Sequence, residues 1–202
     1  DTYIFSFKWS PDSKKILFHD RKMRLRYIDV ESGAVTLVST EKYTVPGDYD
    51  WSPDSKWIAY GSAPKNEFGI IKLYNLETKK FYDVTDSWYD SGSPEFSPDG
   101  KYLYFASSRD FNPTYSRTEW NHSYSDMSKI YLVTLAKDTP SPFASENVLV
   151  KNDDAEKDAK KDDKDDKDGK DGKDEDKSTK IDTDGIGDRI LSLEMKASNY
   201  FN

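Results

Sequence analysis

A short motif recurs three times in the first hundred residues: an aromatic residue, then Ser-Pro-Asp, then Ser or Gly. The copies lie at residues 9–13, 51–55 and 96–100, so that the successive spacings are 42 residues (9 to 51) and 45 residues (51 to 96). A period of about 40–45 residues is typical of β-propellers, in which each repeat is a four-stranded blade that cannot bury both faces alone. The repeat therefore constrains the architecture more strongly than the activity.

The three repeats also agree beyond the motif itself. Apolar residues follow each proline at the same two offsets, five and seven positions later: Ile16 and Phe18, Ile58 and Tyr60, Leu103 and Phe105. A spacing of two is typical of a strand that has one face in the core. Ser-Pro-Asp-Ser/Gly suits a type I turn, because proline presets the second position and Asp tolerates the third. We therefore expect each motif to join the first two strands of a blade.

The remaining strands follow in order. Third strands are expected at 25–30, 70–76 and 129–135, and fourth strands at 35–39 and 81–85. No amphipathic helix of ten residues or more is indicated. The sequence thus predicts an all-β fold, a partial β-propeller of about three to four blades, each with four antiparallel strands. The predicted division is a blade at 1–45, a blade at 46–87, a blade at 88–145 with a long loop at 108–127, and the start of a further blade at 146–202.

The long loop is the first candidate for recognition. From the motif proline to the end of the third strand takes 19 residues in the first repeat (11 to 30), 23 in the second (53 to 76) and 37 in the third (98 to 135). Long loops on a rigid β scaffold commonly carry binding residues. Arg109, Tyr115, Trp120 and His122 are the candidate substrate contacts. The alternative is a loop that packs its own aromatic side chains over a neighbouring blade.

Residues 151–177 form a low-complexity insert of Lys and Asp, with 13 acidic and 9 basic residues. Its net charge of −4 is half of the −8 carried by the whole chain. With almost nothing apolar to bury, such a segment is expected to be disordered or a mobile surface loop. An EF-hand alignment with Gly169 at the sixth position places Lys164 at the first, where calcium requires a carboxylate. No defined metal site is therefore expected.

Catalytic signatures are missing from the sequence. There is no Cys, which excludes disulfides and thiol chemistry, and no Gly-x-Ser-x-Gly elbow or phosphate-binding loop is present. The two histidines, His19 and His122, form no short-spaced ligand pair, and His19 resembles an ordinary residue at the end of a strand. No basic stripe indicates nucleic-acid binding, and no apolar run reaches the length of a membrane span. We expect no cofactor. Because the chain opens on Asp1 rather than Met, we also expect a processed product or an excised piece.

Two resemblances narrow the propeller class. The Trp-Ser-Pro-Asp-Ser-Lys pattern over residues 1 to about 107 is similar to the repeats of TolB and its relatives. The stretch Phe-Ala-Ser-Ser-Arg-Asp-Phe-Asn-Pro at 105–113, the strand Tyr-Leu-Val-Thr-Leu at 131–135 and the segment Lys-Ile-Asp-Thr-Asp-Gly-Ile-Gly-Asp-Arg-Ile at 180–190 resemble the propeller region of bacterial tricorn-type proteases. That family carries charged inserts of variable length at this place.

The tricorn resemblance implies a noncatalytic role for this chain. In that family the propellers precede a PDZ-like module and a serine peptidase core, and no position here matches the motifs of that core. The chain would then guide or gate peptide or protein substrates, and its partners would be those substrates and the remaining domains of the parent protease. Two alternatives are a TolB-like protein–protein binding module and a propeller enzyme with an active site in its central funnel. Two chains of about three blades could also complete a six-bladed homo-oligomeric ring. The resemblance leaves the bacterial cytoplasm and periplasm both open.

Overall fold

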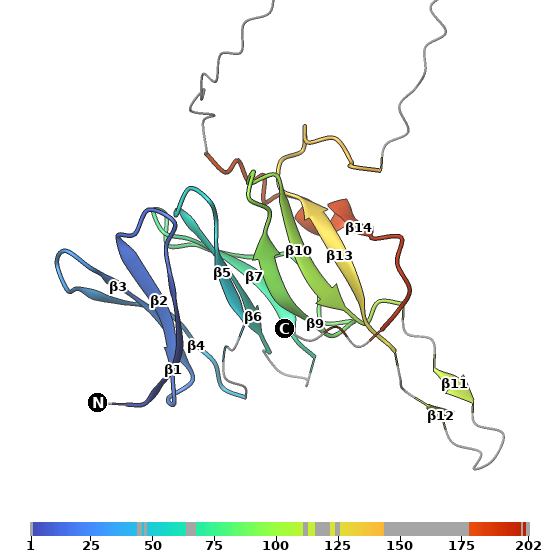
Figure 1. The fold of residues 1–202 in the computed structure, drawn as a ribbon, viewed down its shortest axis with the longest axis horizontal. Coiled ribbons are helices and arrows are strands. Elements are labelled where there is room, and N and C mark those ends of the chain that lie inside the picture. Colours follow the sequence, from blue (N-terminus) through green and yellow to red (C-terminus); the bar gives the residue numbers. More distant parts are fainter. Residues whose placement is uncertain are drawn as a thin grey trace, which may run out of the picture.

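A computed structural model describes residues 2–43, 46, 48–63, 68–110, 113–115, 122–123, 126–143, 178–198 and 200. Three four-stranded antiparallel sheets follow one another in a fan (Figure 1). The first blade holds β1 (Ile4–Trp9), β2 (Lys15–Asp20), β3 (Arg24–Asp29) and β4 (Val35–Thr40). The second blade holds β5 (Tyr49–Trp51), β6 (Trp57–Ser62), β7 (Ile70–Asn75) and β8 (Phe81–Asp83). The third blade holds β9 (Ser91–Phe96), β10 (Tyr102–Ser107), β13 (Lys129–Thr134) and β14 (Ile190–Ser192). The predicted all-β propeller class is confirmed.

The repeated motif forms the turn between the first two strands of each blade. In the first copy the Ser10 hydroxyl donates to Asp12 Oδ1 (2.6 Å) and accepts from the backbone N–H of Lys15 (2.9 Å), while Asp12 Oδ1 also accepts from Lys14 N (3.0 Å). The second and third copies repeat these bonds. Ser and Asp recur because their short side chains satisfy the backbone groups that the turn leaves unpaired.

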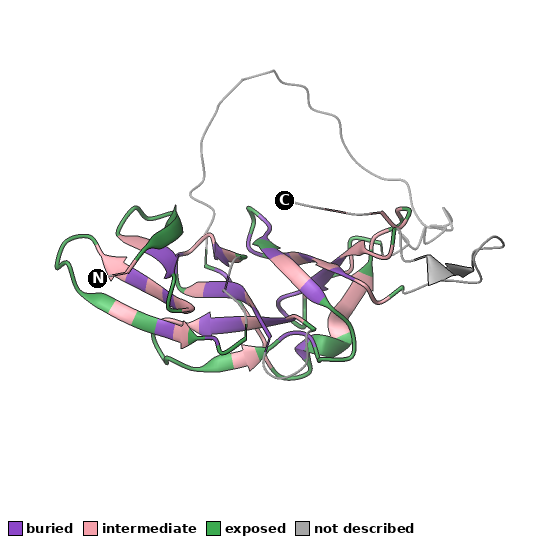
Figure 2. Ribbon diagram, turned by 90° about the horizontal axis from the view of Figure 1, so that it is seen from below, coloured by how far each residue is buried: buried purple, intermediate pink, exposed green. Residues whose placement is uncertain are grey.

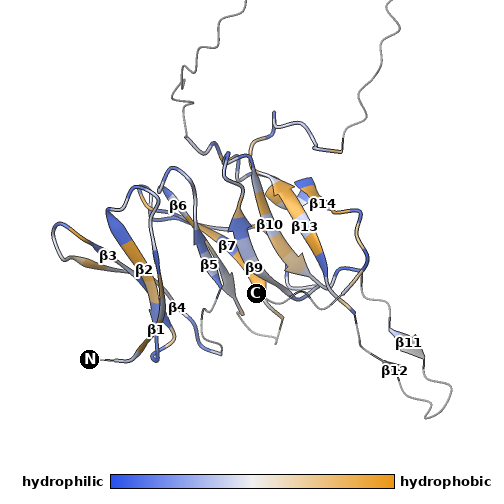
Figure 3. Cartoon of the chain, viewed as in Figure 1, coloured by the Kyte–Doolittle hydropathy of each residue, from blue (hydrophilic) through white to orange (hydrophobic). Residues whose placement is uncertain are grey.

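Packing between neighbouring blades forms the hydrophobic core. One cluster, which includes Leu17, Leu25 and Val38 of the first blade and Trp51 and Ile58 of the second, fills the first junction. A second cluster fills the junction between the second and third blades, and it includes Ile71, Leu73, Phe96, Leu103 and Val133. Buried residues concentrate in the middle strands of the fan, where hydrophobic residues also gather (Figures 2 and 3). The apolar residues at these offsets in the second and third repeats therefore pack against the preceding blade.

The third blade differs from the expected division of the chain. The sequence predicts the start of a further blade at 146–202, whereas Ile190–Ser192 pair with β13 and form the fourth strand of the third blade. The preceding turn of 3-10 helix, η1 (Ile186–Arg189), packs against β13. This strand comes more than fifty positions after its partner, so the repeat period could not indicate the pairing.

Ion pairs join the two segments that flank residues 144–177. Lys137 Nζ lies 3.0 Å from Asp184 Oδ2, and Lys180 Nζ lies 3.0 Å from Asp138 Oδ2. Backbone contacts reinforce them, since Lys137 N donates to Asp182 Oδ2 at 2.8 Å. The chain therefore leaves and re-enters the third blade at one place. Residues 151–177, for which disorder is the prediction, lie outside the described part.

No helix in the described ranges is long and apolar enough to cross a membrane.

Candidate functional site

The long loop of the third blade connects β10 to β13, and two of the four predicted contacts are paired in a short hairpin within it. The short strands β11 (Thr114–Tyr115) and β12 (His122–Ser123) form a two-stranded hairpin in which Tyr115 pairs with His122. Trp120 lies outside the described residues. The hairpin projects away from the fan (Figure 1).

Arg109, the remaining predicted contact, belongs to a cluster at the base of this loop. Its guanidinium carbon lies 5.7 Å from the ring centroid of Tyr89, a cation–π arrangement. The neighbouring Asp110 forms an ion pair with Lys129, at 2.6 Å between Oδ2 and Nζ. Arg109 Nε is buried and finds no hydrogen-bond partner among the described residues. We call Tyr89, Arg109, Asp110, Lys129 and Tyr131 the loop-base cluster.

The electrostatics of the loop-base cluster suit fixed charges rather than proton transfer. Hydrogen bonding to Lys129, with which it forms the ion pair, holds the pKa of Asp110 below its ordinary value. Burial, reinforced by the Asp110 carboxylate, raises the pKa of Tyr131 to about 12. A general acid or base works best with a pKa near the working pH. The cluster offers charged and aromatic contact groups, and the shifts at Asp110 and Tyr131 move both groups away from a working pH near 7.

A second polar cluster, at the junction of the first and second blades, was not predicted. The Ser6 hydroxyl lies 3.1 Å from His19 Nδ1 and 2.6 Å from the Tyr49 hydroxyl, while the ring of Phe5 stacks on His19. Burial lowers the pKa of His19, and the neighbouring Asp20 only partly opposes this. The register of the first hairpin could have revealed the pair, because Trp9 opposite Ile16 also sets Ser6 opposite His19.

A Ser–His pair raises the question of a nucleophile. A serine nucleophile requires a base that a third group orients and a set of donors for the developing oxyanion. Here the contacts of Ser6 and His19 recorded in the described part are with each other, Phe5, Tyr49 and the adjacent Asp20. The arrangement links two blades through Ser6 and Tyr49, which is a structural role.

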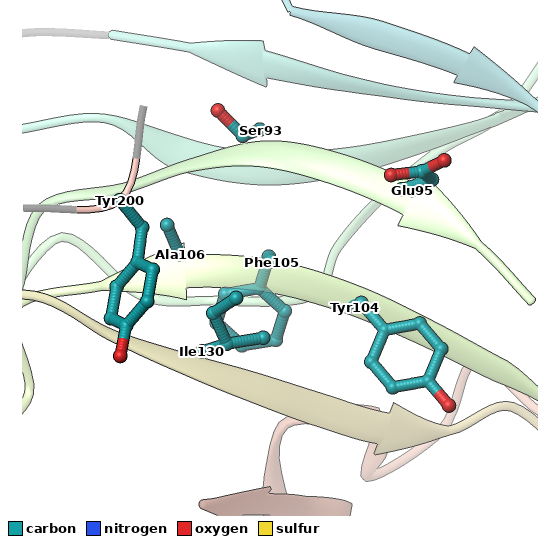
Figure 4. Close-up of a pocket in the computed structure, with 7 residues that line it drawn as sticks. All are labelled: Ser93, Glu95, Tyr104, Phe105, Ala106, Ile130 and Tyr200. Carbon is teal, nitrogen blue, oxygen red and sulfur yellow. The ribbon is translucent and has the colours of Figure 1, made fainter. Parts of the chain in front are cut away.

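A pocket of about 200 Å³ lies on the third blade between β9, β10, β13 and the C-terminal segment. Its lining includes Ser93, Glu95, Tyr104, Ile130 and Tyr200 (Figure 4). Leu103 and Phe105 pack toward the second blade, so the alternate residues Tyr104 and Ala106 belong to the opposite face. The pocket therefore lies on the face of the third blade that points away from the rest of the fan. Within the described ranges no group of three or more His, Cys, Asp or Glu side chains is placed to hold a metal ion.

Comparison with known proteins assigns the family. The family model for the tricorn protease second beta propeller domain matches residues 1–202. The chain belongs to this family. A tricorn-like protease C-terminal subunit from Sulfurisphaera tokodaii is 37% identical over 140 residues, which cover 69% of this chain and 16% of that protein. Tricorn protease homolog 1 from Streptomyces coelicolor is 29% identical over 191 residues, covering 95% of this chain and 17% of the relative.

A solved structure supports the same fold. The crystal structure of the tricorn protease superposes with a TM-score of 0.73 at 20% identity, over 98% of this chain and 18% of that one. The tricorn propeller segment described here thus spans less than a fifth of the length of these relatives.

Proposed function

We propose that this tricorn propeller segment is noncatalytic and guides or gates peptide substrates toward a serine peptidase core outside residues 1–202. The observation that carries the proposal is the loop-base cluster. It combines a guanidinium whose buried Nε has no partner in the described part, a cation–π contact with Tyr89 and an ion pair beside them.

These groups suit an extended peptide. A guanidinium donates hydrogen bonds in a planar fork that matches a carboxylate and also fits backbone carbonyl oxygens. Tyr89 and the adjacent Trp88 are exposed, so their rings offer apolar surface to passing side chains. Contacts of this kind are tolerant of sequence, which a guiding surface for varied peptides requires.

The noncatalytic part of the proposal has separate support. In the loop-base cluster the pKa of Asp110 is lowered and the pKa of Tyr131 is raised, so that both move away from neutral pH. The Ser6 hydroxyl is engaged by Tyr49 of the second blade, and the His19 ring is stacked by Phe5 of its own blade. In the part of the chain that the structure describes, neither cluster has the geometry of a charge-stabilised nucleophile.

The test uses the full-length natural polypeptide with Arg109→Ala, and Arg21→Ala as a matched control on an exposed site of the first blade. Two substrates separate guiding from chemistry: an unstructured peptide of about 30 residues and a short chromogenic peptide. Arg109→Ala should raise KM for the long peptide about three- to tenfold, the loss of one charge-assisted hydrogen bond, with kcat unchanged and the short substrate unaffected.

Equal losses on both substrates, or no change on either, would contradict a guiding role for Arg109. The 202-residue chain alone should not hydrolyse either peptide. Hydrolysis of either peptide by the repurified 202-residue chain would contradict the noncatalytic role.

A further inference from the structure

A chain of side-chain hydrogen bonds joins the first two blades beside a buried histidine. The Ser6 hydroxyl lies 2.6 Å from the Tyr49 hydroxyl of the second blade and 3.1 Å from His19 Nδ1 of its own blade. His19 is 6% exposed, and its ring stacks on Phe5 and meets Tyr49 edge-on, with 5.7 Å between the centroids of the second pair. We call Ser6, His19 and Tyr49 the junction chain.

The direction of the junction chain depends on the protonation of His19. A neutral imidazole nitrogen can accept a hydrogen bond, so that Tyr49 donates to Ser6 and Ser6 donates to His19 Nδ1. In the imidazolium both ring nitrogens carry hydrogen, and neither can accept. Ser6 must then turn its hydrogen toward Tyr49, and the Tyr49 hydroxyl loses its acceptor. A proton on His19 therefore leaves one donor of the junction without its partner.

The charged groups around the ring are already balanced. On the elements around His19 the titratable and charged groups are Lys8 of β1, Asp20 of β2, Arg24 and Arg26 of β3, and Asp48, Tyr49 and Asp50 at β5. Both arginines bind Asp20, and Asp50 Oδ1 lies 2.6 Å from Lys8 Nζ. Three carboxylates thus face three cations, which leaves none for a fourth cation. Burial accordingly lowers the pKa of His19, and the charge of Asp20 only partly opposes this.

The junction between the second and third blades is built differently. Gly61 stands at the position that His19 holds in the first blade. The contact is made instead by a carboxylate and the backbone, since Asp50 Oδ2 accepts the N–H of Phe96 at 2.8 Å. The imidazole is therefore a feature of the first junction and not of the repeat.

We propose that the junction chain makes the contact between the first and second blades sensitive to acid, so that protonation of His19 weakens this junction and leaves the next one unchanged. The sign follows from linkage, because opening the junction exposes the imidazole to water, where its pKa is about 6.5. The closed junction has the lower pKa, so it is fully stable above about pH 6.5 and loses stability as the pH falls. The proposal concerns one blade junction and does not depend on the guiding role.

The experiment compares two equivalent valines that face the two junctions. Val38 packs in the first junction and Val84 in the second, each three positions after the start of its blade's fourth strand, and they are 5% and 1% exposed. Each is changed to Cys in the full-length natural polypeptide, and its reaction with a pyridyl disulfide is read peptide by peptide in a mass spectrometer. Both thiols share the intrinsic effect of pH on the reaction. The ratio of the Val38→Cys rate to the Val84→Cys rate therefore reports how much more often the first junction opens.

Between pH 7.5 and pH 5 this ratio should rise about threefold or more, because the open junction takes up the proton more readily than the closed one. Asp20 does not contribute over this range, since its pKa is held below its ordinary value. His19→Asn keeps a polar side-chain atom near the position of Nδ1 but cannot bind the proton, so it should abolish the rise.

A ratio that stays constant between pH 7.5 and pH 5 would overturn the proposal, and so would a rise of the same size in His19→Asn. Tyr49→Phe supplies a second test should circular dichroism show that His19→Asn does not fold. Without the Tyr49 hydroxyl the chain has no donor to lose its acceptor, so the rise should be smaller than in the natural sequence. An undiminished rise in Tyr49→Phe would assign the acid sensitivity to groups outside the junction chain.

Discussion

Trp9 and Trp51 occupy the same place in successive blades and follow the same turn, but the structure treats them differently. The first is half exposed and the second is buried at 3%. Their local sequences and strand pairing are nearly alike, with Trp9 opposite Ile16 and Trp51 opposite Ile58. The difference therefore comes from the neighbouring blade and not from the repeat itself. In a propeller each repeat contributes only half of every interface in which it takes part.

A second pair of equivalent positions shows the opposite solution. Asp20 ends β2 and is fully buried, with Arg24 NH2 at 2.7 Å from its Oδ2 and Arg26 also bound to it. The corresponding residue of the second blade is Ser62, whose hydroxyl donates to Glu41 Oε2 at 2.8 Å. In the first blade the buried side chain at this position is paired by arginines of the same blade. In the second blade it is paired by Glu41, which follows the last strand of the first blade. Equivalent positions in the first and second blades thus differ in how far they depend on residues outside their own blade.

The largest expected effect is the difference in stability between alanine variants of the two tryptophans. Trp51→Ala should lower the free energy of unfolding of the 202-residue chain by about 3–5 kcal/mol, because it empties a packed junction. Trp9→Ala should cost about 1 kcal/mol or less in the same chain, since half of the ring is already in water. Urea unfolding followed by circular dichroism measures both. Equal losses would mean that Trp9 is packed as closely as Trp51 in this chain.

The next largest effect is the difference in stability loss between substitutions at Asp20 and at Ser62. Asp20→Asn should cost about 3 kcal/mol, because Arg24 and Arg26 lose the carboxylate that balances their charges. Ser62→Ala should cost about 1 kcal/mol, the typical worth of one hydrogen bond. Thermal unfolding of both variants provides the comparison. A smaller loss of stability for Asp20→Asn than for Ser62→Ala would show that the ion pairs of Asp20 with Arg24 and Arg26 do not stabilise the first blade.

The same residue gives a pH dependence of known sign. Burial alone would raise the pKa of Asp20, but hydrogen bonds from Arg24 and Lys22 and the charge of Arg26 hold it below its ordinary value. The unfolded chain therefore binds this proton more readily than the folded one. The stabilisation is complete above about pH 5 and is lost as the pH falls through the lowered pKa of the folded state. Asp20→Asn should make the stability curve flatter below about pH 4.

Much of the fold could be predicted because it is local or periodic. The Ser-Pro-Asp turns specify their own hairpins, and the apolar offsets at Ile58 and Tyr60 mark residues that the structure buries. The pairing of β14 with β13 could not be predicted, because the insert separates the partners and removes the period. The exposure of Trp9 could not be predicted either, because Trp51 stands in the same motif and is buried. Burial that depends on another blade is not encoded in the repeat.

The length of the third repeat drew attention to one connection in the sequence. Arg109 and the hairpin pair of Tyr115 with His122 lie in this connection. Their role in contacting substrate stays a prediction. The partners of Arg109 could not be inferred, because Tyr89 precedes β9 and Lys129 begins β13, far from it in sequence. Ser6 and His19 could have been paired from the hairpin register alone.

The smallest expected effect isolates one hydrogen bond at a blade junction. Ser13 and Ser55 hold the same place in their turns, with φ of 58° and 61°, so any backbone strain is nearly equal in the two. Only Ser55 is buried, and only its hydroxyl accepts the Asp12 N–H at 3.1 Å. Ser55→Ala should therefore cost about 1 kcal/mol in the 202-residue chain and Ser13→Ala close to none.

Chemical denaturation of the two alanine variants, side by side, measures this difference. Ser→Gly at the same positions is the matched control, because glycine relieves a positive φ by up to about 1 kcal/mol at both sites. The gap between Ser55 and Ser13 should persist in the glycine pair, since it arises from the lost acceptor and not from the backbone. Equal losses at Ser13 and Ser55 would mean that the hydrogen bond from Asp12 does not stabilise the junction between the two blades.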